Sequence, residues 1–316
     1  QESRQCILTD AVEVRLYRGE EITSRPDLLI QAARAEVEFE EGAAGRAPKE
    51  ESNAGVLRDL RSVKALTAYS SEDSPLMVSG KNFEMRGEKA SWSSSVRQLR
   101  FFGEQPQSMH LDHEELRGPV RAREIIYDEK TQSVTLRTEV KGELAQGAYR
   151  DQAAPAGAPP PGQKMLWEFE TSELEIRVAK DKAGEFHLSR IEAKDKVLLY
   201  NKALAILLRG DDLLYERDKN RVKIFSQDGR RQTLQHFKDG FKAAGALGGV
   251  AAREKPEAER VDTIDAQEIE AYLYEAPAEA KDGPLRRMVL VSFKKNVMAN
   301  FYVCLLYTSP SPRDRG

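Results

Sequence analysis

The amino-acid sequence predicts an all-β protein built of repeated antiparallel hairpins, and three observations support that fold class. Apolar and polar residues alternate with a period of two in several segments, short polar turns separate those segments, and two parts of the chain repeat each other. A period of two gives a strand one apolar face, whereas a helix needs apolar residues three and four positions apart. One apolar and one polar face are typical of antiparallel sheet.

The alternation itself predicts the individual strands. Val12, Val14 and Leu16 alternate with Glu13 and Arg15, so that one face of this segment is apolar. Each segment of this kind has one face to bury. The same alternation occurs in residues 35–39, 134–140 and 174–178.

Short polar turns are predicted between the strands. Antiparallel strands can be joined by such turns, whereas parallel strands need a crossover of about a dozen or more residues. The sequence therefore predicts a long meander in which neighbouring strands pair, and it argues against an α/β fold. The turns are residues 128–130, 181–184, 218–220 and 228–229.

Four segments interrupt the alternation and are predicted to be disordered insertions at hairpin tips. Their Ala, Gly, Pro and charged residues cannot bury a core, and strand patterns resume after each one. The third is rich in alanine and could instead contain a short helix. The four segments are residues 41–55, 145–163, 241–260 and 276–284.

Internal repeats indicate how the strands are grouped. Residues 83–102 (FEMRGEKASWSSSVRQLRFF) align without a gap with residues 206–225 (ILLRGDDLLYERDKNRVKIF). Both contain Arg-Gly, an acidic residue, an aromatic residue five positions after the glycine, a polar turn and a closing Phe. A second pair is residues 172–178 and 266–273, each followed by an apolar strand that ends near Val197 or Val297. Such repeats predict an elongated stack in which each unit covers its neighbour's apolar face.

Composition narrows the class of function. Charged residues make up 32% of the chain and hydrophobic residues 40%, and the formal net charge is −3. These values are typical of a soluble protein with a moderate core. Nucleic acid is a poor candidate partner, because its phosphates attract basic proteins. No apolar run approaches the roughly 20 residues that a membrane helix needs.

The last residues, 304–316, are predicted to be foreign to the fold. Residues 304–314 (CLLYTSPSPRD) look like a translated sequencing adapter, so we expect this tail to make no native packing contacts. The fold would then occupy residues 1–303, with Cys6 as its single cysteine. One cysteine allows neither an intrachain disulfide nor a cysteine-based zinc site.

One pattern resembles a known family. Residues 210–224 contain Gly-Asp-x-Leu-x-Tyr, a polar turn and Val-x-Ile, and residues 122–136 (AREIIYDEKTQSVTL) have the same shape. This pattern resembles the OstA or LptA-like proteins of lipopolysaccharide transport, and the resemblance covers about two thirds of the chain. The long Pro- and Ala-rich insertions and the length of the chain depart from a single LptA-like unit. A larger envelope protein that uses the same domain, such as an LptD-like protein or an LptC-like fusion, is therefore an alternative.

The resemblance implies an elongated, open antiparallel β-jellyroll in the periplasm or cell envelope of a Gram-negative-type bacterium. Its interior would bind the acyl chains of the lipid A part of lipopolysaccharide. Its edge strands would pair with other β-jellyroll transport proteins or with a second copy of the chain. The candidate lipid-binding residues are inward-facing members of alternating strands, namely Val37, Phe39, Met85, Phe101, Leu136, Ile176, Leu188 and Ile224.

Catalytic, metal and cofactor sites are not predicted. His110 and His113 form, with neighbouring acids, the one cluster of metal-ligand types, but residues three apart on a strand point to opposite faces. Arg209-Gly210-Asp211 spells an adhesion tripeptide, yet the matching repeat has Arg86-Gly87-Glu88, so the glycine is better explained by a bend. No Ser, His and Asp set or phosphate-binding loop accompanies the many acids.

Two functions of different classes remain after the sequence analysis. The leading hypothesis is a periplasmic lipid-binding bridge component of lipopolysaccharide transport to the outer membrane, and the alternative is a non-catalytic scaffold β-repeat protein of the envelope. An open jellyroll would leave room for acyl chains, whereas a closed sandwich would bury its apolar faces against each other. A carbohydrate-binding sandwich is disfavoured because Trp92 and Trp167 are the only tryptophans.

Overall fold

The computed structural model describes residues 5–16, 28–39, 63–80, 83–111, 116, 118–146, 165–180, 186–237, 261–275 and 286–300. Within these ranges the chain forms an 18-stranded antiparallel sheet and no helix, which confirms the predicted all-β class. The strands are β1 (Gln5–Leu16), β2 (Leu28–Phe39), β3 (Val63–Tyr69), β4 (Leu76–Gly80), β5 (Phe83–Gly87), β6 (Lys89–Ser93), β7 (Gln98–Leu111), β8 (Val120–Asp128), β9 (Ser133–Gln146), β10 (Met165–Lys180), β11 (Phe186–Asn201), β12 (Ile206–Glu216), β13 (Arg221–Phe225), β14 (Gln232–Phe237), β15 (Val261–Ala266), β16 (Glu268–Glu275), β17 (Arg286–Lys294) and β18 (Met298–Asn300).

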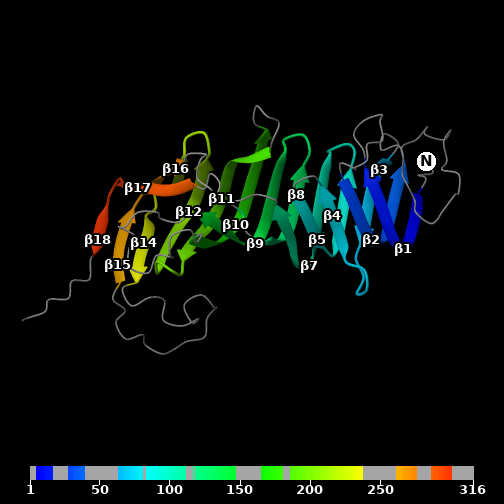
Figure 1. The fold of residues 1–316 in the computed structure, drawn as a ribbon, viewed down its shortest axis with the longest axis horizontal. Coiled ribbons are helices and arrows are strands. Elements are labelled where there is room, and N and C mark those ends of the chain that lie inside the picture. The colour runs from blue at the N-terminus through cyan, green and yellow to red at the C-terminus, as the bar shows by residue number, and fades with distance from the viewer. Residues whose placement is uncertain are drawn as a thin grey trace, which may run out of the picture.

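The molecule is elongated, and its strands follow one another along the long axis in nearly the order of the sequence. Figure 1 shows this order as a colour gradient from the blue strands β1 and β2 at one end to the orange and red strands β17 and β18 at the other. Each described strand pairs with strands close to it in the sequence, such as β10 with β9 and β11. The prediction of an elongated stack agrees with this arrangement.

The long strands bend in the middle, so that their two halves belong to two layers. The β10–β9 pairing shifts register between Thr171 and Glu173, and the β11–β12 pairing shifts between Lys194 and Val197. The first layer contains the short strands β3, β6, β13, β16 and β17, and the second contains β4, β5, β14, β15 and β18. Strands β1, β2 and β7 to β12 run through both layers (Figure 1).

Pairs of residues with left-handed backbone make three of the bends. Thr138 and Glu139 in β9 have φ angles of 64° and 56°, and residues 195–196 in β11 and 295–296 after β17 have φ angles between 51° and 62°. The left-handed conformation is unfavourable for L-amino acids and costs roughly 1–2 kcal/mol of free energy per residue. The pairing on both sides of each bend must therefore hold it in place.

The sheet closes on itself in one part of the molecule, so the openness predicted for the jellyroll is wrong there. Strands β2, β3, β6, β7, β5 and β4 pair in a ring and form a six-stranded barrel. The ring forms because β2 and β7 bend, and each half of these strands pairs with a different short strand. For the same reason Asp228 and Gly229 are not the hairpin turn that we predict. They join β13 to β14, and both of these strands pair with β12.

The first sequence repeat is confirmed as a structural repeat. In β6 and β7, Trp92 lies opposite Leu99, and in β12 and β13 the matching Tyr215 lies opposite Val222. The other half of each unit also pairs in the same way. In the first unit β5 pairs with the end of β7, and in the second unit the start of β12 pairs with β14. The same hairpin is therefore used twice along the stack.

The remaining predictions are confirmed only in part. The strands predicted at residues 12–16, 35–39, 134–140 and 174–178 lie within β1, β2, β9 and β10. Ala145 and Gln146 belong to β9 rather than to an insertion, because they pair with Leu166 and Met165. The turn predicted at residues 181–184, the rest of that insertion, the other three insertions and the tail at 304–316 lie outside the described residues.

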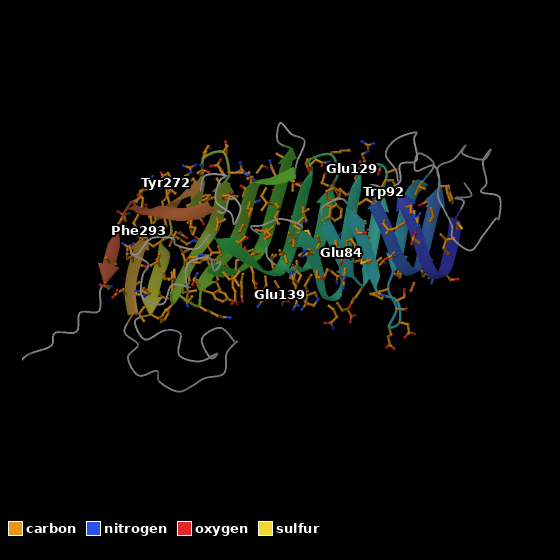
Figure 2. The ribbon with its side chains drawn as sticks, viewed as in Figure 1. Glu84, Trp92, Glu129, Glu139, Tyr272 and Phe293 are labelled. Carbon is orange, nitrogen blue, oxygen red and sulfur yellow. The ribbon has the colours of Figure 1, made fainter. Side chains whose placement is uncertain are left out.

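Opposite charges alternate between neighbouring strands on the outer face of the first layer. Arg137 lies between Glu124 and Glu173, at 3.9 Å and 3.0 Å, and Lys194 Nζ lies 3.4 Å from Glu173. Directly opposed residues of opposite charge stabilise a sheet modestly. This face is thus polar, and its positive and negative charges lie close enough to balance one another. Figure 2 shows the described side chains on the ribbon, in the view of Figure 1.

Candidate lipid-binding interior

Two rows of mainly apolar side chains line the interior of the first layer from β2 to β17. Within each row every residue is the direct cross-strand partner of the next, so the row crosses the layer without a break. The near row, next to the bends, is Ala35, Ala68, Ala90, Phe101, Ile125, Leu136, Leu174, Ala193, Leu213, Ile224, Ile269 and Phe293. The far row is Val37, Leu66, Trp92, Leu99, Tyr127, Val134, Ile176, Ile191, Tyr215, Val222, Ala271 and Val291.

The sequence reasoning selected residues of this interior. Phe101, Leu136 and Ile224 belong to the near row, and Val37 and Ile176 belong to the far row. Met85 contributes to the same core from the second layer, and Leu188 and Phe39 extend it away from the bends. The structure places all eight predicted residues on or against one core, and their contact with lipid stays a prediction. Seven are at most 3% exposed, and Phe39 is partly buried.

Several polar side chains inside the molecule were missed by the sequence reasoning. Gln107 and Gln232 are fully buried near the bends, and Thr171 is 5% exposed. Each has hydrogen-bond partners: Gln107 Oε1 accepts the Glu88 N–H at 2.9 Å, and the Thr171 hydroxyl donates to the Lys194 carbonyl at 2.8 Å. These side chains stabilise the bends through their hydrogen bonds. The alternation of apolar and polar residues does not predict them, because they lie at strand positions that carry no other mark in the sequence.

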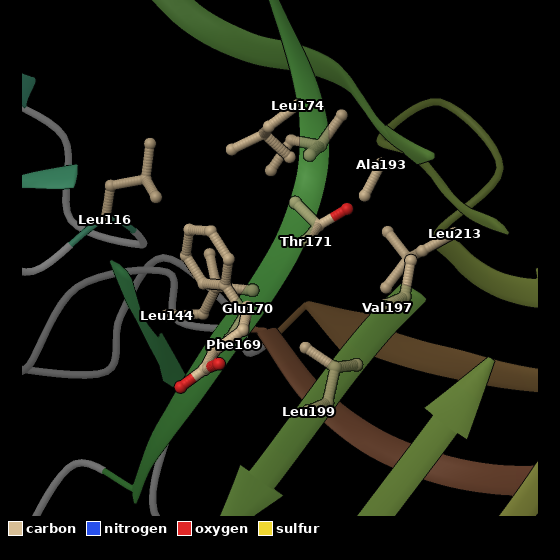
Figure 3. Close-up of a pocket in the computed structure, with 11 residues that line it drawn as sticks. Leu116, Leu144, Phe169, Glu170, Thr171, Leu174, Ala193, Val197, Leu199 and Leu213 are labelled. Atoms are coloured by element: carbon tan, nitrogen blue, oxygen red, sulfur yellow. The ribbon is translucent and has the colours of Figure 1, made fainter. Parts of the chain in front are cut away.

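A cavity lies near the middle of the molecule, where the packing between the layers is incomplete. Its volume is about 20 Å³, close to the space that one water molecule needs. Figure 3 shows side chains from both layers converging on it. It is lined by Leu116, Leu144, Phe169, Glu170, Thr171, Leu174, Ile191, Ala193, Val197, Leu199 and Leu213.

The polar groups at this cavity are already paired. Thr171 donates its hydroxyl hydrogen to the backbone, and the Glu170 carboxylate lies 3.2 Å from Lys141 Nζ. Gly142 lets the Phe169 ring approach the backbone closely, because a Cβ at Gly142 would lie 2.6 Å from Phe169 Cζ. The cavity therefore offers hydrocarbon surface to a ligand and no unpaired polar partner.

The other candidate sites of the sequence do not assemble into a reactive centre in the described part of the chain. His110 lies on β7 opposite Glu84 and is exposed, while residues 112–115 lie outside the described ranges. No group of three or more His, Cys, Asp or Glu side chains is placed there to hold a metal ion. Gly210 lies at the bend of β12, where a Cβ would lie 2.3 Å from Ile224 Cγ2. This crowding supports the bend explanation of Arg209-Gly210-Asp211 over the adhesion tripeptide.

The sequence matches no protein-family model, and no curated protein is significantly similar to it. Within the described residues, no helix has the length and hydrophobicity needed to cross a membrane.

Proposed function

We propose that the chain is a non-catalytic, lipid-binding bridge component of lipopolysaccharide transport in the periplasm or cell envelope, and that its two layers form a β-jellyroll whose interior binds acyl chains. The observation that carries this proposal is the pair of interior rows, which form a continuous, largely apolar lining from β2 to β17. A hydrocarbon chain bound at any position along the axis would contact similar side chains. Such uniformity suits a ligand that slides rather than one that binds a single polar pocket.

The size of the hydrophobic effect makes acyl chains a suitable ligand. Burying hydrocarbon contributes about 0.8 kcal/mol per CH₂, so a ~12-carbon chain that is half covered would gain roughly 5 kcal/mol. Lipopolysaccharide carries several such chains on one headgroup. Together they would bind firmly while each single contact stays weak enough to exchange.

The two ends of the stack supply edges for a bridge. Among the described residues, β1 pairs with β2 alone and β18 pairs with β15 alone. Ile7 on β1 is 57% exposed and Met298 on β18 is 47% exposed. An edge strand with exposed apolar side chains is a template for pairing with another strand. We infer that another transport jellyroll, or a second copy of this chain, pairs there.

Binding to intact and to deacylated lipopolysaccharide tests the proposed function. The purified chain is mixed with each form, and co-elution is measured by size-exclusion chromatography below the concentration at which the lipid aggregates. We expect co-elution with the intact form and none with the fully deacylated form, because the headgroup has no partner in the interior. Absence of binding to both forms by the folded protein would refute the proposal.

A scaffold function is the second candidate, and the close packing of the interior favours it. Leu136 and Ile176 have no exposed surface, and the cavity is only large enough for about one water molecule. As a scaffold, the protein would use its interior only as a core and its edges to join neighbours. The two candidates differ in the chromatography above, because a scaffold binds neither form of the lipid.

A further inference from the structure

The cavity lies where three irregularities of the sheet meet. The β10–β9 and β10–β11 pairings shift register beside Thr171, and the β11–β12 pairing shifts between Lys194 and Val197. Figure 3 shows Thr171, Ala193 and Val197 on one side of the cavity and Leu116 on the other. The cavity therefore lies beside the bends of β10 and β11, where the regular pairing of the sheet is interrupted.

Leu116 is the lining residue of this cavity that lies outside the named strands. It is 2% exposed, yet its backbone joins the sheet through a single bridge to Leu144 rather than through a ladder. Gly118, with a φ of 76°, and Pro119 separate it from the continuous pairing of β8. A residue held by one bridge moves at lower cost than one held on both sides by a strand.

We propose that a saturated hydrocarbon chain enters the interior at this cavity and that Leu116 is the side chain that moves to admit it. This inference rests on the proposed function and adds the point at which the hydrocarbon chain enters the interior. The cavity volume is far below that of an acyl chain, so the space must come from displaced side chains. Because Thr171 and Glu170 already have partners, the part of the ligand that enters is hydrocarbon and the headgroup stays outside.

The two tryptophans of the chain allow this position to be tested directly. Trp167 lies opposite Leu144 on β10, two residues before Phe169, so it is next to the cavity. Trp92 belongs to the far row on β6, in the six-stranded ring. Bromine quenches tryptophan fluorescence only at contact distance. Brominated dodecanoic acid therefore reports which tryptophan the chain reaches in the full-length variants Trp92→Phe and Trp167→Phe.

The proposal predicts that quenching depends on Trp167. Trp92→Phe, which keeps Trp167, should lose more than half of its fluorescence at saturation, and Trp167→Phe should lose little at low concentrations of the acid. Strong quenching of Trp92 alone would overturn the entry point while leaving lipid binding intact. No quenching in either variant, with no binding of the acid by calorimetry, would overturn both the entry point and the proposed function.

Substitution of Leu116 tests its role as the moving side chain. Leu116→Ala should bind brominated dodecanoic acid several-fold more tightly than the unchanged protein, because less side chain must be displaced. Leu207→Ala is the matched control, since Leu207 is 5% exposed, lies outside both rows and is paired with strands on both sides, and its affinity should be unchanged. If Leu116→Ala does not fold, Leu116→Val gives the milder form of the same test. Equal changes at Leu116 and Leu207, or none at Leu116 in a folded variant, would contradict the proposal.

Discussion

Gln107 and Gln232 make the same two hydrogen bonds at equivalent bends of the two repeats. Gln107 Oε1 accepts the Glu88 N–H at 2.9 Å, and Gln232 Oε1 accepts the Asp211 N–H at 2.8 Å. Each side-chain amide also donates to the carbonyl two residues earlier in the chain. Both glutamines are fully buried and each lies against a glycine, so the two bends are built in the same way.

Removing one of these glutamines should destabilise the fold. Gln232→Ala leaves the Asp211 N–H and the Arg230 carbonyl without their partner, and a buried unsatisfied polar group costs about 1–3 kcal/mol. We expect a loss of that size in urea unfolding. Gln227→Ala, on an exposed residue between β13 and β14, should change the stability by less than about 0.5 kcal/mol. Equal effects of the two substitutions would show that the buried amide does not hold the bend.

The stability of the C-terminal part should depend on pH through Glu270. Burial pushes the Glu270 pKa upwards, but hydrogen bonds from Lys294 and Tyr272 and the charge of Lys294 outweigh it and hold the pKa at about 2. A lowered pKa gives stability that is fully present above the usual carboxyl value of 4.5 and is lost as the pH falls towards 2. Glu270→Gln should therefore cost about 2 kcal/mol at pH 7 and roughly half of that or less at pH 3.

Urea unfolding at both pH values measures this difference. Glu72→Gln, at an exposed site between β3 and β4, is the control and should change the stability little at either pH. A Glu270→Gln variant with the same loss at pH 3 as at pH 7 would mean that the Glu270 charge does not stabilise the fold.

Neighbouring residues on opposite faces should differ sharply in their effect on stability. Leu136→Ala removes a side chain with no exposed surface from the near row and should cost about 2–5 kcal/mol. Arg137→Ala removes an outer cation whose side chain is 50% exposed, and pairs of that kind contribute less than about 1 kcal/mol. Thermal or urea unfolding compares the two. A larger loss at Arg137 would show that the faces have been assigned the wrong way round.

The edge strands should drive association that depends on concentration. Sedimentation velocity across a wide concentration range should show the average mass rising as strands pair end to end. Ile7→Lys puts a charge on the exposed edge strand β1 and should weaken this association about tenfold or more. Val96→Lys, which replaces a similarly exposed residue in the turn between β6 and β7, should leave it unchanged. A protein that is monomeric at all concentrations would contradict the bridge model.

Alternation predicted the strands and the inward faces well, because burial on one side forces a period of two whatever the global shape. It failed at the bends, although the sequence marks three of them. Arg137, Lys194 and Lys294 each precede two residues of left-handed backbone, and a valine follows each pair. This basic-x-x-Val pattern at the bends was the available clue. Alternation runs through it without an obvious break.

The ring and the cavity could not be predicted, because both depend on how the two halves of a bent strand pair with different neighbouring strands. The link between β13 and β14 contains Asp228-Gly229, which resembles a hairpin turn, and only the pairing of both strands with β12 shows that it is a bend. Leu116 lies in a polar segment near His113, with no alternation to mark it as buried. Local sequence patterns contain no information on such shared partners.

Site-specific crosslinking to lipopolysaccharide tests whether lipid binds between the two layers. A photoreactive amino acid is placed at Ile176, on the interior face, or at its neighbour Glu175, on the outer face. The full chain is then irradiated with intact lipopolysaccharide in a reconstituted system, and the crosslinked product is measured on a denaturing gel. We predict capture at Ile176 and none at Glu175. Equal capture at both positions, or none at either in folded protein, would contradict lipid binding between the layers and favour the scaffold function.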